Sequence, residues 1–438
     1  MPQSSAQAHW LGNMSLFAFP VNLLVLAAIV AAAVLTVMSS RRKGEKTIFA
    51  TAAMAVFSMA IAAIVAFLPA LGIIARGFFK SPLFMSVELF FLFVLACAVV
   101  DRLVSPKGSL LRTIVFTALH FGVFLSVSAS LFGRFDAESL RMEARRDSFS
   151  EEAFIRPGMA RRIPFEVRLD SFSVEYYKSG IPSDYEAIIT LSGSKETRNA
   201  SLKVNHPVHF EGYDIYLGDY DTKAGSNSQW CSLLLEKEPW KGTVALGIWI
   251  VLLGSLLSLF TLKRMKGGRW TLLVGAAGAL IYIVFILMRT SITSGELVPA
   301  LQSGWFVPHI VAFMFSYSLL GASAVLATVI SCGKKEELLP VLDRLVTAGV
   351  AFFSFGMLMG ALWAKAAWAH YWSWDPKETW SMITWFNFLI YLHLRRSGKN
   401  KPQVACLVVI IAFLTLQMCW WGVNLLPSAS ESVHTYIN

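Results

Sequence analysis

Long apolar runs separated by short polar loops dominate this chain. A helix that crosses a bilayer needs about 20 mostly apolar residues. Runs of this kind predict about ten transmembrane helices, near residues 15–38, 48–74, 83–101, 112–132, 242–262, 269–288, 305–330, 342–363, 379–396 and 402–422. Charged residues make up only 15% of the chain, against about 25% in soluble domains. The pattern therefore predicts an all-α polytopic protein of the lipid bilayer.

Basic residues gather in every second short loop, at residues 41–46, 101–112, 263–269, 333–335 and 395–401. Because Lys and Arg are enriched in cytoplasmic loops, we expect these loops in the cytoplasm and both termini outside it. The same loops account for the net charge of +10, so no nucleic-acid partner is expected. The residues before the first helix contain no Lys or Arg, so we interpret that helix as retained rather than cleaved.

One polar segment, residues 134–241, interrupts the helical pattern. Its strand-like runs at 164–171, 185–191 and 208–217 are separated by turn-forming residues, which predicts a small β-rich extracytoplasmic domain. Its start, DAESLRMEARRDSF, is expected to form a short surface helix. The chain thus divides into an N-terminal transmembrane block (1–133), this domain, a returning helix (242–268) and a second transmembrane block (269–438).

The second block contains the Trp-rich segment, residues 363–380, which reads WAKAAWAHYWSWDPKETW. It is expected to lie flat near the outer surface as a short platform between two spans. Asp375 and Pro376 predict a helix start, with Glu378 in its first turn. Flat aromatic faces beside fixed charges suit a large planar amphipathic ligand, and the alternative is an ordinary interfacial Trp belt. The aromatic candidates are Trp363, Trp368, Trp372, Trp374 and Trp380.

Four histidines form two pairs once the topology is assigned. Ionisable residues within a membrane span are costly and suggest function. His120 and His393 are expected toward the cytoplasmic side, and His309 and His434 toward the outer side. Neutral imidazole is a common axial ligand of haem iron. Each histidine also has a simpler interpretation, such as a hydrogen bond between helices or, for His434, a solvated tail.

The five cysteines form no C-x-x-C pair, which gives no support for a zinc site, a disulfide framework or an attached haem.

The Trp-rich segment resembles the tryptophan-rich "WWD" motif of haem-handling proteins. The following IYLHLR, together with GWFVPHI and VNLLPSASESVHTYIN, is similar to the CcsA (ResC) branch of System II cytochrome c maturation. The earlier segments TALHFGVFLSVSASLFG and VNHPVHFEGYDIYLGDY resemble CcsB (ResB). The chain as a whole therefore resembles a fused CcsB–CcsA cytochrome c synthase.

This resemblance implies a holocytochrome c synthase, or cytochrome c haem lyase. Such a protein carries haem b to the outer face and joins it to the two thiols of a C-x-x-C-H motif in apocytochrome c. By motif match, His120 and His393 would be inner haem ligands, His309 and His434 outer ligands, and Asp375 part of the outer site with the tryptophans. No residue is assigned acid–base catalysis.

The resemblance also implies a location and partners. We expect a bacterial inner membrane, with both termini and residues 134–241 in the periplasm, and thiol-reducing proteins of the periplasm as partners. The sequence departs from the motif at His370, where Gly is common.

Two other functions stay open. One is a haem exporter or chaperone without ligation activity, and the other is a di-haem membrane cytochrome b that oxidises quinol. An outer ligand in a terminal tail beside an aromatic segment favours transfer of a mobile haem over a fixed electron-transfer centre.

Overall fold

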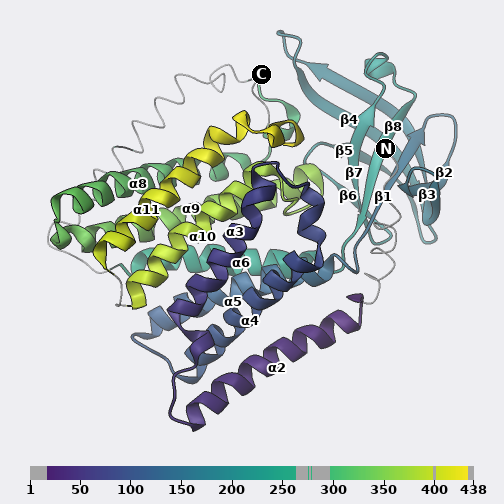
Figure 1. Cartoon of the computed structure of the whole chain (residues 1–438). Helices are drawn as coiled ribbons and strands as arrows, with labels where there is room; N and C mark the ends of the chain where they lie inside the picture. Colours follow the sequence, from purple (N-terminus) through teal and green to yellow (C-terminus); the bar gives the residue numbers. More distant parts are fainter. Residues whose placement is uncertain (1–16, 263–274, 276–277, 279–295, 398–400, 433–438) are drawn as a thin grey trace.

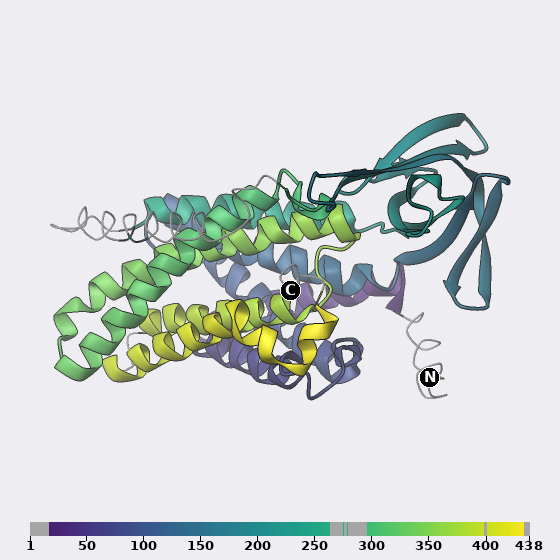
Figure 2. The same cartoon turned by 90° about the horizontal axis from the view of Figure 1, so that it is seen from above.

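The computed structural model describes residues 17–262, 275, 278, 296–397 and 401–432. Long helices form a bundle, and one antiparallel sheet lies beyond its end (Figure 1). Figure 2 shows the sheet at one end of the bundle, with the turn between α8 and α9 at the other. We call these ends the module end and the basic end, because the basic loops at residues 41–46, 101–112 and 333–335 lie at the latter.

Nine long helices lie within the described residues, and eight of them are long and apolar enough to cross a membrane. The ninth, α10, is more polar. The prediction of a polytopic membrane protein is confirmed, while the predicted span at 269–288 lies outside the described residues except for residues 275 and 278. The helices are α2 (Val21–Arg42), α3 (Ala52–Ala70), α4 (Pro82–Val104), α5 (Leu110–Gly133), α6 (Lys241–Phe260), α8 (Phe306–Gly333), α9 (Leu339–Trp368), α10 (Pro376–Ser397) and α11 (Pro402–Trp420).

The polar segment folds into one antiparallel sheet, which confirms the β-rich module. Its strand order is β5-β4-β3-β2-β1-β8-β7-β6. The first and last strands pair in the middle of the sheet, so the chain leaves the module beside the point where it entered, and α6 returns next to α5. The strands are β1 (Glu138–Arg145), β2 (Ser150–Arg156), β3 (Met159–Tyr176), β4 (Pro182–Ser192), β5 (Thr197–Lys203), β6 (Val208–Phe210), β7 (Tyr213–Tyr220) and β8 (Trp230–Lys237).

Two local predictions for the module were wrong. The segment expected to begin it with a helix is largely strand β1, because Leu140, Met142 and Ala144 alternate with polar residues and are buried on one face. The run 208–217 is a hairpin rather than one strand. Its turn places Glu211 and Gly212 at φ values of 46° and 84°, the left-handed conformation that tight hairpin turns require.

The helices form two rings that share a wall. In the first ring, α3, α4, α5, α6, α9 and α10 each contact the next, and α10 contacts α3. In the second, α8, α9, α10 and α11 close on one another in the same way. Helices from the two halves of the chain therefore build the six-helix ring together, and α9 and α10 belong to both rings.

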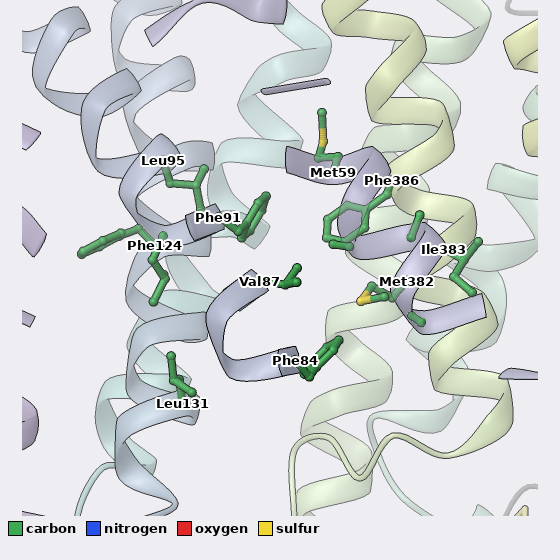
Figure 3. Close-up of a cluster of buried hydrophobic side chains, with 14 of the residues drawn as sticks. Met59, Phe84, Val87, Phe91, Leu95, Phe124, Leu131, Met382, Ile383 and Phe386 are labelled. Carbon is green, nitrogen blue, oxygen red and sulfur yellow. The ribbon is translucent and has the colours of Figure 1, made fainter. Parts of the chain in front are cut away.

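Hydrophobic side chains fill the interior of the six-helix ring toward the module end (Figure 3). The rings of Phe91 on α4 and Phe386 on α10 have centroids 5.5 Å apart, so this core joins the two halves directly. Burial of such apolar side chains contributes about 1.5–3 kcal/mol each. The labelled cluster comprises Met59, Phe84, Val87, Phe91, Leu95, Phe124, Leu131, Met382, Ile383 and Phe386.

Glycines allow α5 and α6 to approach closely. A Cβ added at Gly247 on α6 would lie 2.3 Å from the hydroxyl oxygen of Ser126 and 2.8 Å from the carbonyl oxygen of Gly122, both on α5. The carbonyl belongs to the backbone of α5 and cannot turn away. The closeness of the two helices therefore depends on the missing side chain at residue 247, as at other small-residue helix contacts in membranes.

We predict that Gly247→Ala destabilises the protein by about 1–3 kcal/mol, because overpacking must separate α5 from α6. Thermal unfolding in detergent would measure this. Gly242→Ala on the same helix is the matched control, since a Cβ there meets nothing within 4 Å. Equal unfolding temperatures for the two variants would contradict the close-contact explanation.

Candidate functional site

The two histidines predicted as an inner pair face each other across the six-helix ring. His120 lies on α5 and His393 on α10, and their ring centroids are 6.1 Å apart at an interplanar angle of 70°. The two side chains reach across the interior of the ring, so the backbones of α5 and α10 do not have to touch for the imidazoles to meet. The fold thus brings together one histidine from each half of the chain.

Both imidazoles are oriented by their own helices. Nδ1 of His120 lies 2.8 Å from the carbonyl oxygen of Phe116, and Nδ1 of His393 lies 2.8 Å from that of Leu389. A neutral imidazole whose Nδ1–H donates to a carbonyl presents Nε2 as its ligating nitrogen. The ring of Phe116 also stacks on His120 at 3.8 Å, which fixes the plane of that imidazole.

The spacing of the pair fits a shared metal ion. Because imidazole nitrogens bind transition metals at about 2 Å and the ring centroid lies about 1 Å further back, two rings on one ion have centroids roughly 6 Å apart. The observed separation is 6.1 Å. The described residues contain no group of three or more His, Cys, Asp or Glu side chains that could hold a metal, so the remaining ligands would have to come from the bound molecule.

An ionic anchor between α9 and α10 holds His393 in this direction. Asp343 on α9 accepts two hydrogen bonds from the guanidinium of Arg395, at 2.7 and 2.9 Å, and one from the hydroxyl of Tyr391 at 2.7 Å. Tyr391 and Arg395 are four residues apart and so share one face of α10. His393, midway between them, lies on the opposite face. Asp343 was not singled out from the sequence, although an acidic residue beside a span is a signal of function.

The charged residues of the Trp-rich segment form a capping box at the start of α10. The carboxylate of Asp375 accepts from the backbone N–H of Lys377 at 2.9 Å, and that of Glu378 accepts from the N–H of Asp375 at 3.0 Å and of Ser373 at 2.8 Å. This reciprocal arrangement satisfies backbone donors that a helix start would otherwise leave unpaired. The helix start predicted at Asp375 and Pro376 is confirmed.

The tryptophans divide into two groups. Trp363 and Trp368 belong to the last turns of α9, with ring centroids 5.0 Å apart. Trp372 and Trp374 lie in the connection to α10, with centroids 6.0 Å apart. Trp380 is buried in α10 and donates from Nε1 to the carbonyl of Ala70 at 3.1 Å. The segment is therefore partly helical, and only its middle joins the two helices.

The middle of the segment packs on the first half of the chain. The ring of Trp374 stacks on Phe79 at 4.2 Å and 10°, and Phe79 lies in the turn Arg76–Lys80 between α3 and α4. Trp374 has a φ of 59°, a conformation that costs energy in a bulky residue and needs support from its surroundings. The stacking on Phe79 and the capping box on either side of Asp375 provide that support.

His309, the first predicted outer ligand, lies beside the start of this segment. It sits on α8, with Nδ1 2.8 Å from the carbonyl oxygen of Gly356 and its ring 5.7 Å from that of Trp363. A Cβ added at Gly360 would lie 2.7 Å from the imidazole, so a glycine on α9 makes room for the ring. The fold thus places His309 in contact with the Trp-rich segment.

His434, the second predicted outer ligand, lies outside the described residues. The described chain ends two residues earlier, at Ser432, whose hydroxyl donates to the buried carboxylate of Asp375 at 3.1 Å. The C-terminal part of the chain is therefore bonded to the Trp-rich segment at the last residue described. His370 is exposed within that segment.

An ion pair connects the segment to the sheet module. The ammonium of Lys365 contacts the carboxylate of Glu238 at 2.5 Å and the carbonyl oxygen of Ala369 at 2.6 Å. Ala369 ends α9 in a left-handed conformation, with φ at 72°. At the same junction, burial raises the pKa of Glu236 to about 7, and partial burial raises that of Tyr371 to about 12. A single lysine thus fixes both the module and the corner before Trp372.

Two family models match the chain in succession. The ResB-like family matches residues 107–228, and the cytochrome C assembly protein family matches residues 239–430. The first match contains His120, and the second contains His309, His393 and the Trp-rich segment. The pair of facing histidines is therefore composed of one residue from each matched region.

Curated relatives match about a third of the chain. The chain is 34% identical over 168 residues to the cytochrome c biogenesis protein CcsA of Chlamydomonas reinhardtii, covering 35% of this chain and 47% of the relative. It is 35% identical over 189 residues to CcsA of Trachelium caeruleum, covering 33% of this chain and 59% of the relative. The chain thus spans about half the length of the curated relatives it matches.

The capping box yields a prediction about the order of the Trp-rich segment. In Glu378→Ala, the N–H groups of Ser373 and Asp375 lose their acceptor, which should cost about 1–2 kcal/mol locally. Hydrogen exchange of these two amides should accelerate accordingly. Glu378→Gln, which keeps an acceptor oxygen, is the matched control and should stay close to the wild type. Unchanged exchange in Glu378→Ala would show that the box does not hold the segment.

Proposed function

We propose that this chain, in which a ResB-like region is followed by a cytochrome c assembly region, is a holocytochrome c synthase of the fused CcsB–CcsA kind. Its substrates are haem b and an apocytochrome c with a C-x-x-C-H motif. It moves haem from the basic end of the bundle to the module end and attaches it there. The site would lie in a bacterial inner membrane, with the module in the periplasm and thiol-reducing proteins supplying reduced cysteines.

One observation carries this proposal: the facing imidazoles of His120 and His393, 6.1 Å apart. Their spacing suits two axial bonds to one haem iron. The two histidines also come from different halves of the chain, so both matched regions are needed to form the pair. A haem held here would lie between α5 and α10, inside the bundle that both halves form.

At the module end, His309 would bind the iron together with His434. Trp363 and Trp368 supply aromatic surface beside His309, and Asp375 bonds to Ser432, two residues before His434. The Trp-rich segment would thus hold both the porphyrin and the tail that carries the second ligand. In this assignment the tryptophans and Asp375 position the substrate and do not take part in bond making.

The attachment step needs alignment more than acid–base catalysis. Each cysteine thiol adds across a vinyl group of haem, so that sulfur bonds to one vinyl carbon and hydrogen to the other. The histidine of the C-x-x-C-H motif would replace one outer histidine on the iron and so bring both thiols to the vinyl groups. Proximity of this kind can supply several kcal/mol of the barrier reduction. The protein contributes by holding the haem in one orientation until the apocytochrome arrives.

We predict that covalent haem on a C-x-x-C-H reporter, co-expressed with the protein and detected after denaturing electrophoresis, falls roughly tenfold or more in His393→Ala and in His309→Ala. His206→Ala is the control, because His206 is exposed on the sheet module. The haem content of each purified variant is measured in parallel.

The outcomes separate the candidate functions. If the wild-type protein delivers haem to the outer side but the reporter carries no covalent haem, the protein is an exporter or chaperone. Two tightly held haems that quinol reduces reversibly would identify a membrane cytochrome b. Full reporter maturation in both histidine variants would refute the ligand assignment.

A further inference from the structure

Two arginines lie on the basic side of the facing histidines. The guanidinium of Arg102, at the end of α4, lies 4.2 Å from the ring centroid of Phe116. That ring in turn stacks on His120 at 3.8 Å. Arg396 lies on α10, three residues after His393. Arg102 therefore lies next to His120, with the ring of Phe116 between them, and Arg396 lies one helical turn after His393.

The helix geometry places both arginines at the same depth. Phe116 precedes His120 by four residues, and Arg396 follows His393 by three, so each lies on the face of its histidine. One helical turn rises about 5.4 Å. Because α5 begins and α10 ends at the basic end, both positive charges lie about one turn closer to that end than the imidazoles. The histidines and the arginines therefore form two levels of one site.

The two positive charges at this level are only partly balanced by the protein, since the neighbouring Asp101 acts on Arg102 and, among the described residues, no acidic residue is seen to act on Arg396. Arg102 is close enough to Arg396 for its charge to act on that residue, and both arginines act on His120. Within the described part of the chain, neither forms an ion pair with a carboxylate. Arg102 donates to the carbonyl oxygen of Lys107 at 2.9 Å, and the neighbouring Asp101 is already paired with Arg41 and Lys107. Two like charges held together at the edge of a low-dielectric bundle are unfavourable unless an anion joins them.

On the other side of the histidine pair, toward the module end, the surroundings are apolar instead of cationic. The side chains between the helices there are apolar, and the rings of Phe91 and Phe386 point toward each other (Figure 3). A ligand between the histidines thus meets two cations on one side and hydrocarbon on the other. Such a site suits a planar molecule with carboxylates along one edge only.

We propose that Arg102 and Arg396 bind the two carboxylates of the haem that His120 and His393 ligate, so that the carboxylate edge faces the basic end and the vinyl edge faces the module end. This inference rests on the proposed function and adds a defined orientation to it. Guanidinium groups bind carboxylates with paired, charge-assisted hydrogen bonds. The orientation directs the reactive vinyl groups toward the side where the thiols would be supplied.

The test uses haem and its dimethyl ester, whose carboxylates are blocked, added to the full-length protein. The His309→Ala background restricts binding to the inner pair, and absorbance follows occupancy. We expect the protein to prefer haem over the ester. Arg102→Gln and Arg396→Gln should each weaken haem binding roughly tenfold to a hundredfold and leave ester binding unchanged, so that the preference shrinks. The control is Arg42→Gln, an exposed arginine at the same end of the bundle, which should keep the preference intact.

Conservative variants show whether a loss of haem binding comes from the missing charge or from misfolding. Arg102→Lys and Arg396→Lys retain the charge and should recover most of the preference. Equal affinity for haem and ester in the protein with both arginines, or an undiminished preference in the double Gln variant, would overturn the orientation. Those results would leave the synthase proposal standing if His120→Ala still abolished the spectrum of a six-coordinate haem. An unchanged spectrum in His120→Ala would instead refute the inner ligand pair itself.

Discussion

The contact on which this structure depends is the approach of two imidazoles, His120 and His393, across the interior of a six-helix ring. Neither helix can set that distance alone. On one side, α5 is held against α6 by the glycine contact at residues 122 and 247. On the other, α10 is fixed to α9 by the bonds of Asp343 to Arg395 and Tyr391. The first support joins the two matched regions to each other and the second lies within the second region, so the spacing of the pair depends on both regions being in one chain.

The Trp-rich segment is fixed by equally specific contacts, and several of its polar side chains have structural partners. Asp375 and Glu378 close a capping box, and Trp380 bonds to the end of α3. Lys365 joins the segment to Glu238 at the exit of the sheet module. A movement of the module would therefore reach the corner at Ala369 directly. This connection offers a route by which a partner bound to the module could alter the Trp-rich segment.

The periodicity of the sequence was sufficient for the helices and for the start of α10, since long apolar runs and the Asp-Pro-Lys-Glu pattern act locally. It was insufficient where a local signal was misleading. The charged residues of 136–149 suggested a surface helix. The segment forms strand β1 instead, because Leu140, Met142 and Ala144 alternate with polar residues and are buried on one face. The Glu211–Gly212 turn was likewise overlooked within an apolar run.

Contacts between distant residues lay beyond the sequence altogether. Topology and family resemblance proposed His120 and His393 as a pair, but no pattern in the chain gives their separation. The bonds of Lys365 to Glu238 and of Asp343 to Arg395 join residues 127 and 52 positions apart. The sharing of α9 and α10 between two rings is also a result of packing, because apolar runs identify helices but not their neighbours.

The most direct test of the shared-iron geometry is electron paramagnetic resonance of the ferric haem in the His309→Ala protein, where only the inner pair can bind it. Imidazole planes that stay near the 70° seen here predict a low-spin signal with the strong g-anisotropy of near-perpendicular axial ligands, absent from the His120→Ala/His393→Ala double variant. A high-spin signal from the protein with both histidines would contradict the account.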